Sequence, residues 1–336
     1  MVDSGGVVPL IDIGPFLEGS EAGKAQVAQA VDRACREIGF LVIKGHGVPD
    51  GLIADMYRIS AEYFALPTWE KMALKMPPDR YRGYTPLGSE SLAYSLDMET
   101  PPDIKESFSI GPFDTPYDEY HFGPAGARYF APNMWPERPA GMRAIWQAYY
   151  SEMTRLSSDL MRIFAVALGM PEYFFADKID DHITNFSVIH YPGQDERPAT
   201  GQMRGGEHTD YGSLTIVQTN TDVGGLEVER RDGGWEAVPW VKGAFNINIG
   251  DLMAEWTNDE WVSTMHRVAN PPPDQAHVSK TSLLFFHQPN YDAVVECIPT
   301  CTGPDNPPKY NKTTSGEHVT MKVNKHRAPD LGEAAE

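Results

Sequence analysis

The pattern of apolar and polar residues divides the chain into a helical first half and a strand-rich second half. Apolar residues recur at helical spacing in three stretches, which predicts helices at residues 24–38, 49–64 and 140–168. Two shorter apolar runs, 7–13 and 40–43, are followed by Gly-containing turns and predict strands. Residues 80–99 are rich in Gly, Pro, Ser and Tyr, so we expect a loop there.

From residue 183 onward, short apolar runs alternate with turn residues. Residues 226–229 and 235–238 flank Arg-Arg-Asp-Gly-Gly, which is a strong β-hairpin signal. Further strands are predicted at residues 185–191, 214–217, 245–249, 262–268 and 282–287, with a turn at Gly250-Asp251. Roughly six to eight short strands at regular spacing favour a sandwich or a double-sheet jelly roll. We therefore predict a mainly β fold with flanking helices, in which helices from the N-terminal half pack outside a jelly-roll core.

Composition narrows the classes of partner and the cellular compartment. The 336 residues carry a formal net charge of −19, and such a surface disfavours nucleic acid and anionic lipid. No apolar run approaches the ~20 residues of a membrane span, and the first six residues lack the features of a secretion signal. The three Cys form no disulfide framework, and reduced thiols are favoured over a Cys297–Cys301 pair or metal site. We expect a soluble, cytoplasmic protein that acts on a small molecule.

Three residues with metal-binding side chains suggest a metal site. His208 and Asp210 stand two residues apart at the start of a predicted strand, where side chains at i and i+2 share a face. His266 follows 56 residues after Asp210, in another strand-like run. Two imidazoles and one carboxylate leave coordination positions open, and non-heme Fe(II) oxygenases use this arrangement. A His-x-Asp pair alone is a weak signal in a chain with ten His.

A second pair strengthens the metal hypothesis. Lys280 and Ser282 begin the next predicted strand, again at i and i+2. A cation and a hydroxyl that point inward together would suit an anionic co-substrate beside the metal.

The chain resembles the isopenicillin N synthase-like family of Fe(II)- and 2-oxoglutarate-dependent dioxygenases over nearly its whole length. The motifs that carry the resemblance are Glu37-Ile38-Gly39-Phe40, Gly45-His46-Gly47, Arg82-Gly83-Tyr84, Asp103-Ile104-Lys105-Glu106, His190-Tyr191-Pro192, His208-Thr209-Asp210-Tyr211-Gly212, Asn248-Ile249-Gly250-Asp251 and His266-Arg267-Val268. The resemblance implies a double-stranded β-helix core with His208, Asp210 and His266 as iron ligands. It also implies Fe(II) as the metal, 2-oxoglutarate as co-substrate and O2 as oxidant.

The resemblance also implies a division of the chain within one compact unit. Residues 1–110 would form the N-terminal dioxygenase region, which feeds strands into the core sheet. Residues 111–180 would form a helical linker region, residues 181–300 the catalytic jelly roll, and residues 301–336 a C-terminal tail.

The sequence departs from the family at Lys280, because the family holds the far carboxylate of 2-oxoglutarate with Arg-x-Ser. Lys offers a point charge where Arg offers a planar fork. Lys280 and Ser282, helped by Tyr191, could still hold 2-oxoglutarate, which is the interpretation we favour. The alternatives are a 2-oxoglutarate-independent oxidase, an ethylene-forming variant, or a cupin-like protein that binds a ligand without catalysis.

The activity implied by the resemblance is oxidation of an unactivated C–H bond of a small molecule, with release of succinate and CO2. Hydroxylation, desaturation and ring closure all remain open. We expect no catalytic side chain beyond the metal centre. The residues predicted to contact substrate are Arg82, Met203, Arg204 and Phe286, whereas His46 is expected to be structural.

Overall fold

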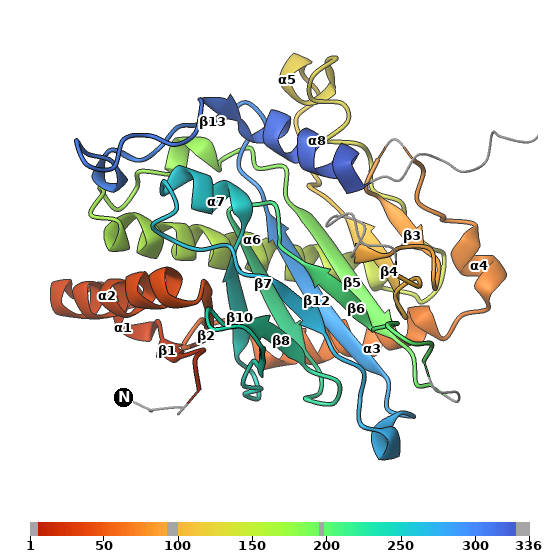
Figure 1. Cartoon of the computed structure of the whole chain (residues 1–336). Helices are drawn as coiled ribbons and strands as arrows, with labels where there is room; N and C mark the ends of the chain where they lie inside the picture. The colour runs from red at the N-terminus through yellow and green to blue at the C-terminus, as the bar shows by residue number, and fades with distance from the viewer. Residues whose placement is uncertain (1–5, 79, 93–99, 195–197, 327–336) are drawn as a thin grey trace, which may run out of the picture.

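The computed structural model of the chain describes residues 6–78, 80–92, 100–194 and 198–326. An eight-stranded sheet, in the order β1-β2-β10-β7-β12-β5-β4-β3, lies against a four-stranded sheet in the order β6-β11-β8-β9 (Figure 1). The strands are β1 Leu10–Asp12, β2 Phe40–Lys44, β3 Gly83–Thr85, β4 Glu106–Ile110, β5 Asn185–Tyr191, β6 Gly205–His208, β7 Leu214–Thr219, β8 Leu226–Glu229, β9 Trp235–Ala237, β10 Phe245–Ile249, β11 His266–Val268, β12 Lys280–His287, β13 Val294–Val295 and β14 Thr313–Thr314. The predicted jelly-roll core is therefore confirmed.

The long helices of the chain pack against one face of the large sheet. The α-helices are α1 Gly14–Leu17, α2 Glu21–Glu37, α3 Asp50–Phe64, α4 Thr68–Met72, α5 Glu119–Phe122, α6 Met142–Ala167, α7 Asp251–Trp256 and α8 Ser315–His326. The long helix α6 packs against α2 and α3 behind the sheet (Figure 1). Among the described residues, no helix combines the length and apolar character needed to cross a membrane.

Alternation along the central strands separates the helix-covered face from the opposite face. On β5 and β12, Phe186 and Phe285 pack their rings against aromatic side chains of α6. Their neighbours in sequence, including Asn185 and Phe286, must then face the other way, because successive side chains of a strand alternate. This second face of the large sheet lines the cavity described below.

The N-terminal strands extend the large sheet at both edges. β1 pairs with β2, which pairs with β10, whereas β3 pairs with β4, which pairs with β5. Helix α2, which precedes β2, is capped at its N-terminus by Ser20, whose Oγ accepts a hydrogen bond from Gly23 N at 3.1 Å. It ends before Gly39, whose φ of 68° favours a residue without a side chain. The boundaries proposed at residues 110, 180 and 300 stay a prediction.

Three differences between the structure and the sequence predictions concern the secondary structure outside the candidate metal site. Residues 83–85, expected in a loop, form β3, which Tyr84 fixes by donating its hydroxyl to Glu106 at 2.5 Å; residues 79 and 93–99 of that predicted loop lie outside the described ranges. The strand expected at 262–268 is shorter and comprises only β11. Val262 lies instead beside the end of α2, where its backbone N–H donates to Cys35 O. Asp251, expected in a turn, starts α7.

Candidate metal centre and cavity

The two predicted histidine ligands lie opposite each other in the small sheet. His208 ends β6, His266 begins β11, and the two residues are direct partners in the antiparallel pairing. Asp210 does not lie on a strand as predicted, because it falls in the connection to β7. Its backbone carbonyl accepts from Asp251 N at 2.8 Å, which holds this connection against the start of α7. The convergence of the three side chains therefore comes from a fixed turn as well as from strand geometry.

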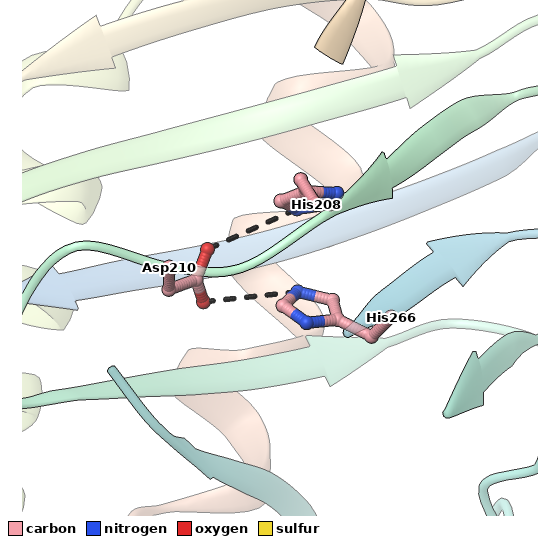
Figure 2. Close-up of side chains that lie close together, drawn as sticks. All are labelled: His208, Asp210 and His266. Atoms are coloured by element: carbon pink, nitrogen blue, oxygen red, sulfur yellow. Dashed lines mark ion pairs between the residues drawn. The ribbon is translucent and has the colours of Figure 1, made fainter. Parts of the chain in front are cut away.

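The donor atoms of these three residues converge on one point. All of them lie within 4.8 Å of one another. His208 Nε2 is 3.8 Å from Asp210 Oδ1, and His266 Nε2 is 3.9 Å from Asp210 Oδ2 (Figure 2). Donors at this spacing suit a single metal ion that binds nitrogen and oxygen.

Neighbouring groups orient each candidate ligand. The Nδ1 atoms of His208 and His266 lie 2.8 Å and 3.0 Å from the backbone carbonyls of Gly206 and Thr264. A carbonyl oxygen only accepts, so each Nδ1 carries the proton and each Nε2 offers its lone pair to the metal position. Asp210 Oδ2 accepts from Thr215 Oγ1 at 2.6 Å and from Asn248 Nδ2 at 2.7 Å. Sequence reasoning did not identify the two carbonyls or Thr215.

Electrostatics favours the protonation states that bind a metal. Burial and the neighbouring His266 lower the pKa of His208 well below its usual range, so its imidazole is neutral near pH 7. Burial acts to raise the pKa of Asp210, but His266, His208 and the two hydrogen bonds outweigh it and hold that pKa below its usual range. The site thus offers neutral imidazole and ionised carboxylate, the forms that a metal requires.

A cavity of about 630 Å³ opens on the three candidate ligands. Strand β12 contributes Lys280, Ser282, Leu284 and Phe286 to its wall, which confirms that Lys280 and Ser282 face inward together. Tyr191, the pairing partner of Lys280 on β5, lines the same end. Lys280 is buried and donates from Nζ to Gly224 O at 3.1 Å. Burial, followed by the nearby Arg204, lowers the pKa of Lys280 to about 8.

Two protein families match consecutive parts of the chain. Residues 8–138 match the N-terminal region of non-haem dioxygenases in morphine synthesis, and residues 183–289 match the 2OG-Fe(II) oxygenase superfamily. The chain belongs to the 2OG-Fe(II) oxygenase superfamily. It is a dioxygenase that uses Fe(II) and 2-oxoglutarate.

Relatives of this oxygenase match it over most of their own length. A homoarginine-6-hydroxylase of Oryza sativa subsp. japonica is 34% identical, with 94% of this chain and 96% of the relative covered. A validamycin A dioxygenase of Streptomyces hygroscopicus subsp. limoneus is 33% identical, with 88% and 80% covered. The crystal structure of a full-length Neurospora crassa protein in complex with alpha-KG and thymine superposes with a TM-score of 0.83 at 29% identity, and the match covers 96% of this chain and 98% of that one.

The residues predicted to contact substrate fall into two groups in this oxygenase. Arg82 and Phe286 line the cavity, and Arg82 is buried, not a surface residue. Met203 and Arg204 are not among the described lining residues. Arg204 is fully buried and donates to the backbone carbonyls of Val223 and Val278. These two residues lie in the two loops beside Lys280.

Lys105 is a cavity residue of this oxygenase that sequence reasoning missed. It is 6% exposed, lies 3.8 Å from Asp103 and 3.4 Å from Glu90, and lines the cavity. Strand alternation could have identified it. Glu106, the first residue of β4, faces the buried Lys71 on the helix side, so the preceding Lys105 faces the cavity. The expected structural role of His46 is confirmed by its hydrogen bonds with Gly243 O and Val48 N.

Proposed function

We propose that His208, Asp210 and His266 hold the Fe(II) of this dioxygenase, and that Lys280, Ser282 and Tyr191 hold the far carboxylate of 2-oxoglutarate. The observation that carries the proposal is the shared cavity. Three convergent metal donors open on it, and a buried cation and a hydroxyl lie farther along the same wall, on β12.

Lys280 has the capacity for this role despite replacing the family's Arg. Its ammonium group has three donors, and one is used by Gly224 O, which leaves two for a carboxylate. Ser282 Oγ adds a third donor from the same face of β12. Arg204 supports this end of the cavity through the backbone, since its guanidinium ties together the two loops beside Lys280.

Fe(II) held by these three residues would supply the oxidising chemistry with O2, and 2-oxoglutarate would be converted to succinate and CO2. The protein residues position the reactants and exclude bulk water from the centre. We infer a small-molecule substrate oxidised at an unactivated C–H bond, with Arg82 and Phe286 in contact with it. Met203 and Arg204 would then influence substrate only indirectly.

The substrates named for the relatives do not transfer directly. Homoarginine, named for the rice relative, carries a guanidinium that needs an acidic partner. Among the described residues of this cavity, Asp210 is the only carboxylate, and it belongs to the candidate iron site. This contrast argues against a substrate that carries a guanidinium.

Stoichiometric iron binding tests the proposed ligand set. The full chain should bind one equivalent of Fe(II) without O2 and, with 2-oxoglutarate added, show a visible charge-transfer band. His208→Ala, Asp210→Ala and His266→Ala should each lose both signals, whereas His277→Ala, which removes an exposed histidine, should keep them. A folded triad variant that still binds one equivalent would show that the ligands are misassigned. A normal iron signal without any response to 2-oxoglutarate would favour the oxidase alternative.

We also infer a cytoplasmic location and no nucleic acid or membrane partner. The net charge of −19 and three buried, unpaired cysteines support this inference.

A further inference from the structure

A buried guanidinium stands in the cavity wall without an opposite charge. Arg82 is 3% exposed, and its acceptors are all neutral: the carbonyls of Tyr81 and Tyr129 and the side-chain amide oxygen of Asn185. Within the described part of the chain, no carboxylate forms an ion pair with Arg82, and its Nε–H has no acceptor. A buried cation without a counter-charge is costly, so an anionic ligand would complement it.

Packing fixes the orientation of this guanidinium. A Cβ atom added at Gly111 would lie 1.8 Å from Nη2 of Arg82 and 2.0 Å from its Cζ. The guanidinium therefore lies against the Gly111 backbone, where no side chain fits. A planar fork held in one orientation can bind a carboxylate with little loss of conformational freedom.

The other cations of the cavity already have partners or assignments. Lys280 lies at the proposed co-substrate end, and Lys105 has Asp103 and Glu90 nearby. Arg128 is exposed and lies over the ring of Tyr129 at 5.3 Å. Arg82 is thus the cavity cation for which the described residues provide no counter-charge.

Strand register places Arg82 at a useful distance from the metal centre. Asn185, Phe286 and Thr215 are neighbours across β5, β12 and β7, and Thr215 donates to Asp210. Two strand spacings amount to about 10 Å, which is the reach of a roughly eight-carbon chain or of a ring with a short side chain. The ring of Phe286 lies between the two ends of this row and lines the cavity.

We propose that the substrate is a small organic carboxylate whose carboxylate pairs with Arg82 and whose apolar body lies across Phe286 toward the His208–Asp210–His266 centre. The proposal rests on the proposed function of that centre and adds the substrate class. The proposal concerns binding and not turnover, so it can be tested before the substrate is identified.

The test uses matched probes that differ only in charge. Carboxylates with aliphatic, alicyclic and aromatic bodies, for example 3-phenylpropanoate, are compared with the amide and the amine of the same body. Binding is measured by calorimetry on the full chain loaded with Fe(II) and 2-oxoglutarate without O2. We expect the best carboxylate to bind at least about tenfold more tightly than its amide, with the amine weakest.

One substitution isolates Arg82 without removing it. Asn185→Asp keeps the shape of the side chain but gives Arg82 a carboxylate partner within the protein. This variant should fold normally and bind the carboxylate probe about tenfold more weakly, or weaker still. Its affinity for 2-oxoglutarate should stay within about threefold of that of the parent. Asn311→Asp adds the same charge at an exposed position and should change nothing.

The outcomes separate this inference from the proposed function. A missing charge-transfer band would refute the iron and 2-oxoglutarate assignment, whereas a normal band without a preference for the carboxylate probe would refute only the substrate class. Equal binding of carboxylate and amide, binding of no probe, or an unchanged preference in Asn185→Asp would overturn the inference. A tenfold loss in Lys105→Met with none in Asn185→Asp would also overturn it, because the carboxylate would then pair with Lys105.

Discussion

Replacing Lys280 with Met should weaken 2-oxoglutarate binding and stabilise the fold at the same time. Met is close to Lys in length and fills the same buried volume without a charge. Loss of a charged hydrogen bond to the far carboxylate costs about 1.5–3 kcal/mol, so KM for 2-oxoglutarate should rise about 10- to 150-fold. Burial lowers the pKa of Lys280 from 10.5 to about 8, which corresponds to roughly 3 kcal/mol of unfavourable free energy for the charged form in the fold.

The expected gain in stability depends on pH with a defined sign. Below pH 8, Lys280 is charged in both the folded and the unfolded chain, and the full penalty applies. Between about pH 8 and 10.5 the unfolded chain binds more protons, so the parent protein gains stability as pH rises. Lys280→Met should therefore be more stable than the parent at pH 7, by up to about 1.5 kcal/mol once the lost charged hydrogen bond to Gly224 O is subtracted. This advantage should shrink above pH 8.

Two assays on the same protein check the opposing effects. Calorimetric unfolding without ligands gives the stability difference at pH 7 and pH 9, and succinate formation gives KM for 2-oxoglutarate. Lys242→Met, at an exposed position, is the control and should change neither quantity. A KM within twofold of the parent would mean that another residue holds the far carboxylate. A loss of stability at pH 7 would mean that the charge of Lys280 is compensated within the protein.

Three further predictions concern the same centre. Thr215→Val and Asn248→Ala each remove one hydrogen bond to Asp210, so titration should show an Fe(II) affinity about 10- to 100-fold lower. Thr215→Ser retains the hydroxyl and should retain the Fe(II) affinity of the parent. Tyr191→Phe should raise KM for 2-oxoglutarate about fivefold if its hydroxyl contacts the co-substrate, and an unchanged KM would limit Tyr191 to packing. Because Lys280 loses its proton near pH 8, KM for 2-oxoglutarate should rise above that pH, and Lys280→Arg, which stays charged, should abolish the rise in a pH profile.

The sequence predicted the candidate ligands and the inward face of β12 because both depend on local rules. Lys280, Ser282 and Phe286 share a face by the two-residue period of a strand, and the structure confirms this. The position of Asp210 depends on a contact with α7 that is distant in sequence, so the assumption of a continuous strand was wrong there.

Long-range packing also explains what the sequence could not show about the cavity cations. Nothing near Arg82 in the chain indicates that its side chain is buried. Its buried position depends on Gly111, Tyr129 and Asn185, which come from three separate segments. The three-residue strand β3, next to Arg82, was missed for the same reason, because its pairing partner β4 supplies the ordering contacts.

The cavity has a cation at each of two ends, Lys280 at one and Arg82 at the other. Neighbouring strand residues connect the Arg82 end to Asp210 of the metal centre. Lys280 at one end is a point charge with a pKa near 8, so its charge responds to pH and to the arrival of a carboxylate. At the other end, burial lowers the pKa of Arg82 to about 10, so this guanidinium stays charged at neutral pH. The two anions are then distinguished by geometry, because packing fixes the planar guanidinium of Arg82 in one orientation, whereas the ammonium of Lys280 is a point charge. Exchanging the two side chains should then impair binding of both ligands, although the net charge of the cavity would be unchanged.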